Sequence, residues 1–359
     1  MIKKMIELLS QPGAKHLSAK TMIGASLISA QVLLSLGSMA GVEPLTNKAD
    51  IDIVETYSDN KFQTNIASQN KTDEAINYSK LNFKAMKYGG TYYLTLDKQD
   101  MLTLIAKAIK EVDNEYIKNG NKTVFAEGDS RYSYFDEYYL LGMMTTETDL
   151  RMIKLKDETR LFDVDNYERY SDKHSGVEYN GLGMMNRNTI EYIKDTDRKK
   201  VNNFKNYEYL PVGNANIELT FENLNPYDYV LSKKPQTENE FKQCLAENIM
   251  FTAKCSYIYL NRIVKDNVKK GTHDAGYNAL MSYSQLNKYS NKEKQIFFGL
   301  LGYNQGPSVT YNSMIDKKMF AKNAKGEHLN NVKYSIETFE HAQELRAEFG
   351  KELSKWECF

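Results

Sequence analysis

The stretch that decides the fold is Phe297-Phe-Gly-Leu-Leu-Gly-Tyr303-Asn304-Gln-Gly306-Pro307-Ser-Val309. Its apolar residues predict a helix over 292–301. Gly306-Pro307 marks the turn that follows, because these two residue types break helices and favour turns. The stretch therefore predicts a helix whose end presents the polar side chains of Tyr303 and Asn304.

Three shorter segments precede this stretch in a fixed order. The first is an apolar helix from Tyr134 to about Thr148 that ends in Glu147-Thr148. The second is Gly181-Leu-Gly-Met-Met-Asn186. The third is Asn248-Ile249, which lies in a helical pattern over 240–268. None of them specifies a function alone, but their order together with the Tyr-Asn-x-Gly-Pro turn is informative.

This order resembles the catalytic domain of lytic transglycosylases of the SLT type and the related goose-type lysozyme. In that family the helix ends in Glu-Ser, a Gly-Leu-Met-Gln segment and an Asn-Ile pair follow, and Ala-Tyr-Asn-Ala-Gly-Pro closes the set. The resemblance covers roughly residues 130–315. It departs from the family pattern at Thr148, where the family has Ser, and at Asn186, where it has Gln.

The resemblance implies a lysozyme-like fold and cleavage of peptidoglycan glycan strands without a metal or other cofactor. Helical periodicity independently predicts a mainly α (α+β) class, with loop insertions at 149–180 and 195–240. Catalysis is expected from Glu147. Substrate binding is expected from Thr148, Gly183, Met184, Met185, Asn186, Tyr303 and Asn304.

The chemistry expected of Glu147 requires a carboxyl group that stays protonated near neutral pH and donates its proton to the leaving oxygen. An unperturbed Glu has a pKa of about 4.3, so burial must raise it. Leu140, Met143 and Met144 precede Glu147 by one and two helical turns and could supply that apolar surrounding. Arg151 would oppose the effect if it paired with Glu147, so we expect it to point elsewhere.

Three functions fit these residues. A lytic transglycosylase needs one carboxyl group, because the muramic acid hydroxyl closes onto the anomeric carbon and leaves a 1,6-anhydro end. A hydrolytic lysozyme needs a second carboxylate to activate water. The third alternative is a catalytically silent glycan-binding or structural module. The candidates for the second carboxylate are Asp149, Asp163, Asp165, Asp172 and Glu178.

The N-terminal residues 1–42 predict a signal peptide or a membrane anchor. Residues 21–42 carry no charge, lysines precede them, and Ser-Met-Ala ends at Ala40, a small-x-small cleavage pattern. Export to the periplasm, cell surface or medium is the first interpretation. The alternative is a phage virion or secretion apparatus, with 21–42 serving assembly or membrane contact.

The rest of the chain is expected to form three parts. Residues 43–125 would be an accessory region with a strand at 92–96 and a helix at 98–118, and residues 126–315 the catalytic domain. Residues 316–359 would be a C-terminal helical extension, with its helix at 336–353.

Charge, motifs and cysteine spacing argue against several other kinds of site. The 47 basic and 47 acidic residues give a formal charge of zero, so no large cationic field is present for nucleic-acid binding. HExxH, CxxC and GxxxxGK[ST] motifs are missing from the sequence. A calcium loop at Asp163 fails because Glu168 stands where the turn requires Gly. Cys244 and Cys255 are too far apart on one helix for a disulfide.

Overall fold

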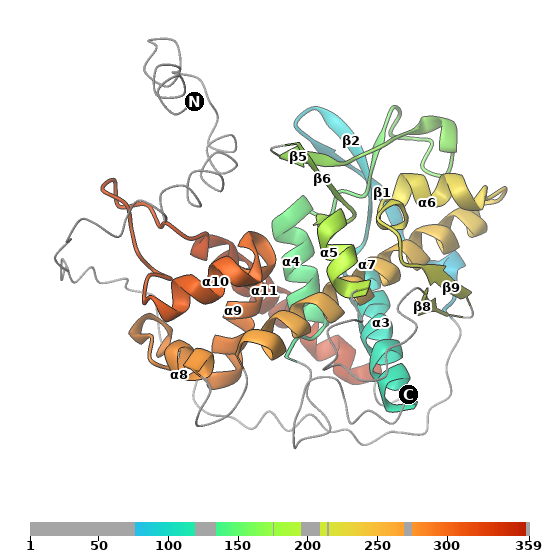
Figure 1. Ribbon diagram of the computed structural model, residues 1–359. Coiled ribbons are helices and arrows are strands. Elements are labelled where there is room, and N and C mark those ends of the chain that lie inside the picture. The colour runs from blue at the N-terminus through green and yellow to red at the C-terminus, as the bar shows by residue number, and fades with distance from the viewer. Residues whose placement is uncertain are drawn as a thin grey trace, which may run out of the picture. The chain divides into compact units, whose positions relative to one another are not determined.

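The computed structural model (Figure 1) describes residues 76–118, 134–174, 176–194, 209–213, 215–268 and 275–356. The chain divides into two compact units, residues 1–74 with 173–177, and residues 75–172 with 178–359. The candidate site belongs to the second unit. The signal or anchor expected over 1–42 lies outside the described residues.

The described residues are mainly helical with small sheets, which confirms the prediction of a mainly α class. The helices are α3 (Lys98–Lys118), α4 (Glu137–Thr148), α5 (Arg187–Lys194), α6 (Pro226–Lys233), α7 (Glu238–Asn267), α8 (Ala275–Met281), α9 (Asn291–Gln305), α10 (Pro307–Ile315) and α11 (Val332–Trp356). Short 3-10 helices lie at Tyr78–Lys80, Val164–Asn166, Glu222–Leu224 and Ser284–Leu286.

Short strands form three small sheets. They are β1 (Phe83–Tyr88), β2 (Thr91–Leu96), β3 (Ile153–Leu155), β4 (Tyr167–Glu168), β5 (Asp172–His174), β6 (Val177–Asn180), β7 (Met185–Asn186), β8 (Tyr209–Val212) and β9 (Ala215–Glu218). The sheets have the orders β1-β2-β3-β4, β5-β6-β7 and β8-β9. The insertion at 149–180, expected to be loop, therefore contributes strands, because its short alternating segments pair with β2 and with each other.

Helix α7 forms the centre of the helical part (Figure 1). It begins with a capping box in which Thr237 and Glu240 satisfy each other's backbone amides. Its side chains are buried along most of its length, and it packs against α3, α6 and α9. The buried ammonium of Lys254 on α7 contacts the carboxylate of Glu111 on α3 at 2.5 Å, so this charge is paired inside the core.

Helix α11 packs closely against α4. At Gly142 of α4, an added Cβ would lie 2.9 Å from the carbonyl oxygen of Thr338 and 3.1 Å from the amide of Ala342. The two helices can approach this closely only because position 142 lacks a side chain. The interface brings the C-terminal helix beside the end of α4 that carries Glu147.

The helices on either side of the expected catalytic domain take part in this packing. The expected boundaries at 125/126 and 315/316 would leave α3 and α11 as accessory pieces. In the structure, α3 packs against α4 and α7, and α11 packs against α4 and α9, all within one unit. The amphipathic faces of both helices are thus part of the same core.

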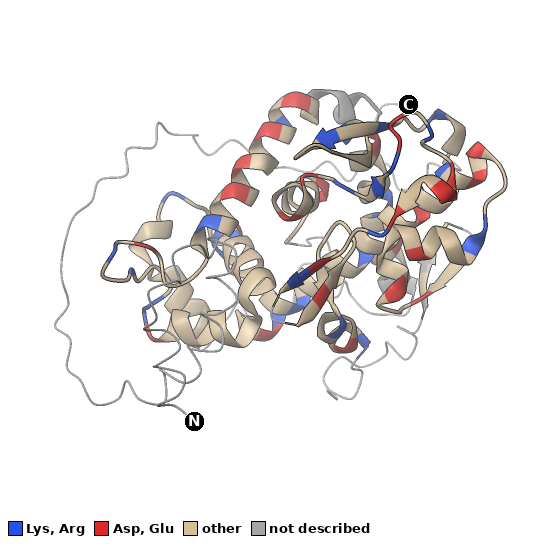
Figure 2. Ribbon diagram, turned by 90° about the horizontal axis from the view of Figure 1, so that it is seen from above, with Lys and Arg blue, Asp and Glu red and all other residues tan. Residues whose placement is uncertain are grey.

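Charged residues of both signs are interspersed along the elements (Figure 2), in keeping with the zero formal charge. Among the helices of the described ranges, none has the length and apolar character that crossing a bilayer requires.

Candidate functional site

Glu147 lies in the last turn of α4. The side chain of the N-cap residue Asp136 accepts a hydrogen bond from the amide of Tyr139, and the apolar residues Leu140, Met143 and Met144 of the helix are fully buried. Glu147 itself is only partly exposed. Its carboxyl group therefore lies at the border between the apolar interior and solvent.

The Tyr334 hydroxyl donates a hydrogen bond of 2.7 Å to Glu147 Oε1. Tyr334 is buried at the start of α11. Burial raises the pKa of Glu147 to about 7, the hydrogen bond from Tyr334 lowers it, and the charge of Asp172 raises it. Burial is the largest effect, so a substantial fraction of Glu147 is protonated at neutral pH.

The backbone directly after Glu147 is strained. Asp149 and Leu150 have φ values of 50° and 62°, a left-handed conformation that is costly for a bulky residue such as Leu. Leu150 is nevertheless buried, and the amide of Asp149 donates to the carbonyl of Thr145. Strained residues held by packing occur preferentially at functional sites, so this turn supports a functional role for the end of α4.

Arg151 is directed away from Glu147, as predicted. Its Nε donates to the carbonyl oxygen of Thr148 at 2.6 Å, and a guanidinium nitrogen lies 3.7 Å from Asp149. The guanidinium thus binds a carbonyl at the C-terminal end of α4, where a cation is favourable. The pKa of Glu147 is consequently not lowered by this cation.

Tyr303 connects two of the sequence segments. From the end of α9 its hydroxyl donates to the carbonyl of Gly183. Burial raises the pKa of Tyr303 well above its ordinary value, and the charge of Glu147 raises it further. Tyr303 also raises the pKa of Tyr334, so Glu147 and these two hydroxyls are electrostatically coupled, and we call the three groups the Glu147 cluster.

Gly183 fits tightly between α7 and Tyr303. An added Cβ would lie 2.8 Å from both Ser256 Oγ and the Tyr303 hydroxyl. The space that a side chain would need is therefore filled by protein atoms. The next residue, Met184, is partly exposed and has a φ of 46°, which adds a third strained position around the cluster.

The other expected site residues have structural partners. Thr148 is fully buried, and its hydroxyl donates to the carbonyl of Met144. Met185 is buried in the core, and Asn186 caps α5 by accepting from the amide of Thr189 at 3.0 Å. Asn304 is exposed, and its side-chain oxygen accepts from Asn331 at 2.8 Å.

Among the five candidates for a second carboxylate, Asp172 is the one whose charge acts on Glu147. Glu178 pairs with Arg169, and Asp149 with Arg151. Asp163 pairs with Arg160 and accepts the amide of Asp165. Among these candidates, Asp172 is therefore the one that is electrostatically coupled to Glu147.

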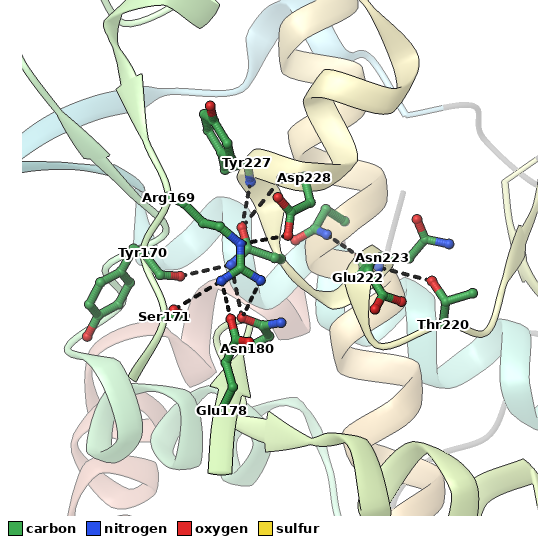
Figure 3. A network of polar contacts seen from close by, with 12 residues as sticks. Arg169, Tyr170, Ser171, Glu178, Asn180, Thr220, Glu222, Asn223, Tyr227 and Asp228 are labelled. Carbon is green, nitrogen blue, oxygen red and sulfur yellow. Dashed lines mark hydrogen bonds and ion pairs between the residues drawn. The ribbon is translucent and has the colours of Figure 1, made fainter. Parts of the chain in front are cut away.

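The segment that carries Asp172 is fixed by a polar network around Arg169 (Figure 3). The Arg169 guanidinium donates to Asp228 of α6 at 2.8 Å and pairs with Glu178 of β6. Asn225 donates to the carbonyl of Tyr170 at 2.9 Å. These bonds join the residues after β4 to β6 and α6, and they hold residues 169–171, directly before Asp172, in place.

Tyr334 was not among the residues expected from the sequence. It lies in a region expected to be an extension, just before the helix predicted at 336–353, and a single Tyr at such a position gives no sign of a site. Within the described ranges, no group of three His, Cys, Asp or Glu side chains could hold a metal ion.

Comparisons with known proteins found no matching protein-family model, no similar curated protein and no similar solved structure.

Proposed function

We propose that the chain is a peptidoglycan lytic transglycosylase that cleaves the β-1,4 bond between N-acetylmuramic acid and N-acetylglucosamine. The observation that carries the proposal is the partly exposed carboxyl group of Glu147. It accepts a hydrogen bond from the Tyr334 hydroxyl, and its pKa is raised to about 7. A pKa close to the operating pH is what a group needs in order to donate and then accept a proton.

In the proposed reaction, protonated Glu147 donates its proton to the glycosidic oxygen as the bond to the anomeric carbon breaks. The C6 hydroxyl of the muramic acid then attacks the anomeric carbon, and the Glu147 carboxylate accepts the hydroxyl proton. The Tyr334 hydrogen bond stabilises the carboxylate between these two steps, because hydrogen bonds to charged acceptors are strong. One carboxyl group is enough for this cycle.

Hydrolysis by a lysozyme-type mechanism is the second candidate, and Asp172 favours it. Its charge acts on Glu147, and inverting hydrolysis needs a carboxylate across the glycan to activate water. The two candidates differ in their products: the transglycosylase leaves 1,6-anhydro ends, whereas the hydrolase leaves reducing ends.

The test is incubation of the purified full chain with peptidoglycan, followed by mass spectrometry of the released muropeptides. Anhydro products support the transglycosylase, and hydrated reducing ends support the lysozyme. Intact sacculi contradict both and leave the silent glycan-binding module. Asp172→Asn separates the two further, because it should abolish hydrolysis and leave anhydro release largely intact.

A further inference from the structure

An exposed tyrosine lies next to the strained turn after Glu147. Tyr88, at the end of β1, is 44% exposed. The Arg151 guanidinium carbon lies 4.1 Å from the centre of its ring. A cation over the ring holds it in place, while 44% of the residue's surface stays exposed to solvent.

The surroundings of Tyr88 extend the aromatic surface. The same guanidinium carbon lies 5.4 Å from the ring of Tyr93 and 5.2 Å from that of Tyr170. Tyr93 and Tyr170 pack edge to face at 5.4 Å between ring centres, and both are partly exposed. Arg151, whose side chain is 12% exposed, is therefore the central contact of three rings that come from β1, β2 and the segment after β4.

This cluster is continuous with the candidate site. Arg151 Nε donates to Thr148, the residue next to Glu147. Asp172 acts electrostatically on both Tyr170 and Glu147. Beyond Tyr88, an added Cβ at Gly89 or Gly90 would meet no atom within 4 Å, so the tip of the β1–β2 hairpin borders open space.

We propose that Tyr88, held by Arg151 and flanked by Tyr93 and Tyr170, is a stacking platform for an N-acetylated sugar ring of the glycan strand that occupies the Glu147 site. This inference rests on the proposed function, because the shared ligand is a glycan strand. Pyranose rings present a C–H face that packs on an aromatic ring, and tyrosine hydroxyls can bind the sugar's polar groups.

The edge-to-face pair of Tyr93 and Tyr170 and the largely buried guanidinium of Arg151 fix the position of the Tyr88 ring. A long side chain that must be ordered on binding loses rotamer freedom, whereas a ring already fixed by a guanidinium does not. The Arg151 positive charge is also shared with Asp149, so the platform has little net charge and suits a neutral sugar ring.

The experiment measures binding of an N-acetylglucosamine hexasaccharide by calorimetry, in the full chain carrying Glu147→Gln so that no turnover occurs. Adding Tyr88→Ala should raise the dissociation constant about five- to tenfold. Tyr88→Trp should keep the affinity, because the larger ring preserves the stacking face. The control is Leu231→Ala, a similarly exposed apolar residue on α6, which should not change binding.

The outcomes separate this inference from the proposed function. Hexasaccharide binding that Tyr88→Ala leaves unchanged would overturn the platform, even if the wild type cleaves peptidoglycan. Weakened binding in Tyr88→Ala, with no cleavage by the wild type, would support the platform and contradict the transglycosylase. Absence of any hexasaccharide binding would overturn the platform, and muropeptide release would then decide the proposed function by itself.

Discussion

Replacing Glu147 by Gln should stabilise the protein and should abolish the glycan cleavage proposed above. The carboxyl group has a pKa of about 7 in the folded chain against 4.5 as its ordinary value. The folded state thus binds the proton more tightly than the unfolded state. This difference corresponds to about 3 kcal/mol by which the ionised carboxyl destabilises the fold at high pH.

The pH dependence has a definite sign. Below about pH 4.5 the carboxyl is protonated in both states, and Gln changes little. As pH rises from 4.5 to 7, the unfolded wild type releases its proton first, so the wild type loses stability relative to the variant. Above pH 7 the difference is constant. Gln can still accept the Tyr334 hydrogen bond through its side-chain oxygen.

The assay is urea-induced unfolding at pH 4, 6 and 8. The variant should gain about 3 kcal/mol over the wild type at pH 8 and almost nothing at pH 4. Glu158→Gln, at a solvent-exposed position, serves as the control and should show no such trend. Equal stabilities of wild type and Glu147→Gln at all three pH values would refute the argument that burial dominates at Glu147.

Three further predictions concern the groups around this carboxyl. Tyr334→Phe removes the hydrogen bond that lowers the Glu147 pKa, so the alkaline limb of the pH–rate profile should move up by about one pH unit. Gly142→Ala pushes α4 away from α11 and should lower the free energy of unfolding, measured by thermal unfolding, by about 1–3 kcal/mol. It should also reduce muropeptide release. Gly183→Ala should displace the Tyr303 hydroxyl and lower the rate of muropeptide release, while circular dichroism still shows a folded protein.

The helices were predictable because their apolar residues repeat at helical spacing. The expected helices at 98–118, 240–268 and 292–301 correspond to α3, α7 and α9, with ends shifted by a few residues. The same spacing places Leu140, Met143 and Met144, which are fully buried, one and two helical turns before the partly exposed Glu147.

The strands in the 149–180 insertion and the role of α11 could not be read in the same way. Two- and three-residue strands such as β3 and β4 have too few residues for a period-two pattern, and their pairing with β2 is a tertiary effect. Tyr334 reaches Glu147 across the interface of α4 and α11, which pack closely at Gly142. Such a contact, between residues far apart in the chain, leaves no local signal.

The most direct measurement is the titration of the Glu147 carboxyl by carbon-13 NMR, with side-chain-labelled glutamate and Glu147→Gln to assign the signal. The structure predicts one carboxyl resonance, absent from the variant, that titrates with an apparent pKa of about 7. A Glu147 resonance that titrates at about 4.5, like an exposed glutamate, would contradict a proton held at the end of α4 and with it the proposed catalytic role.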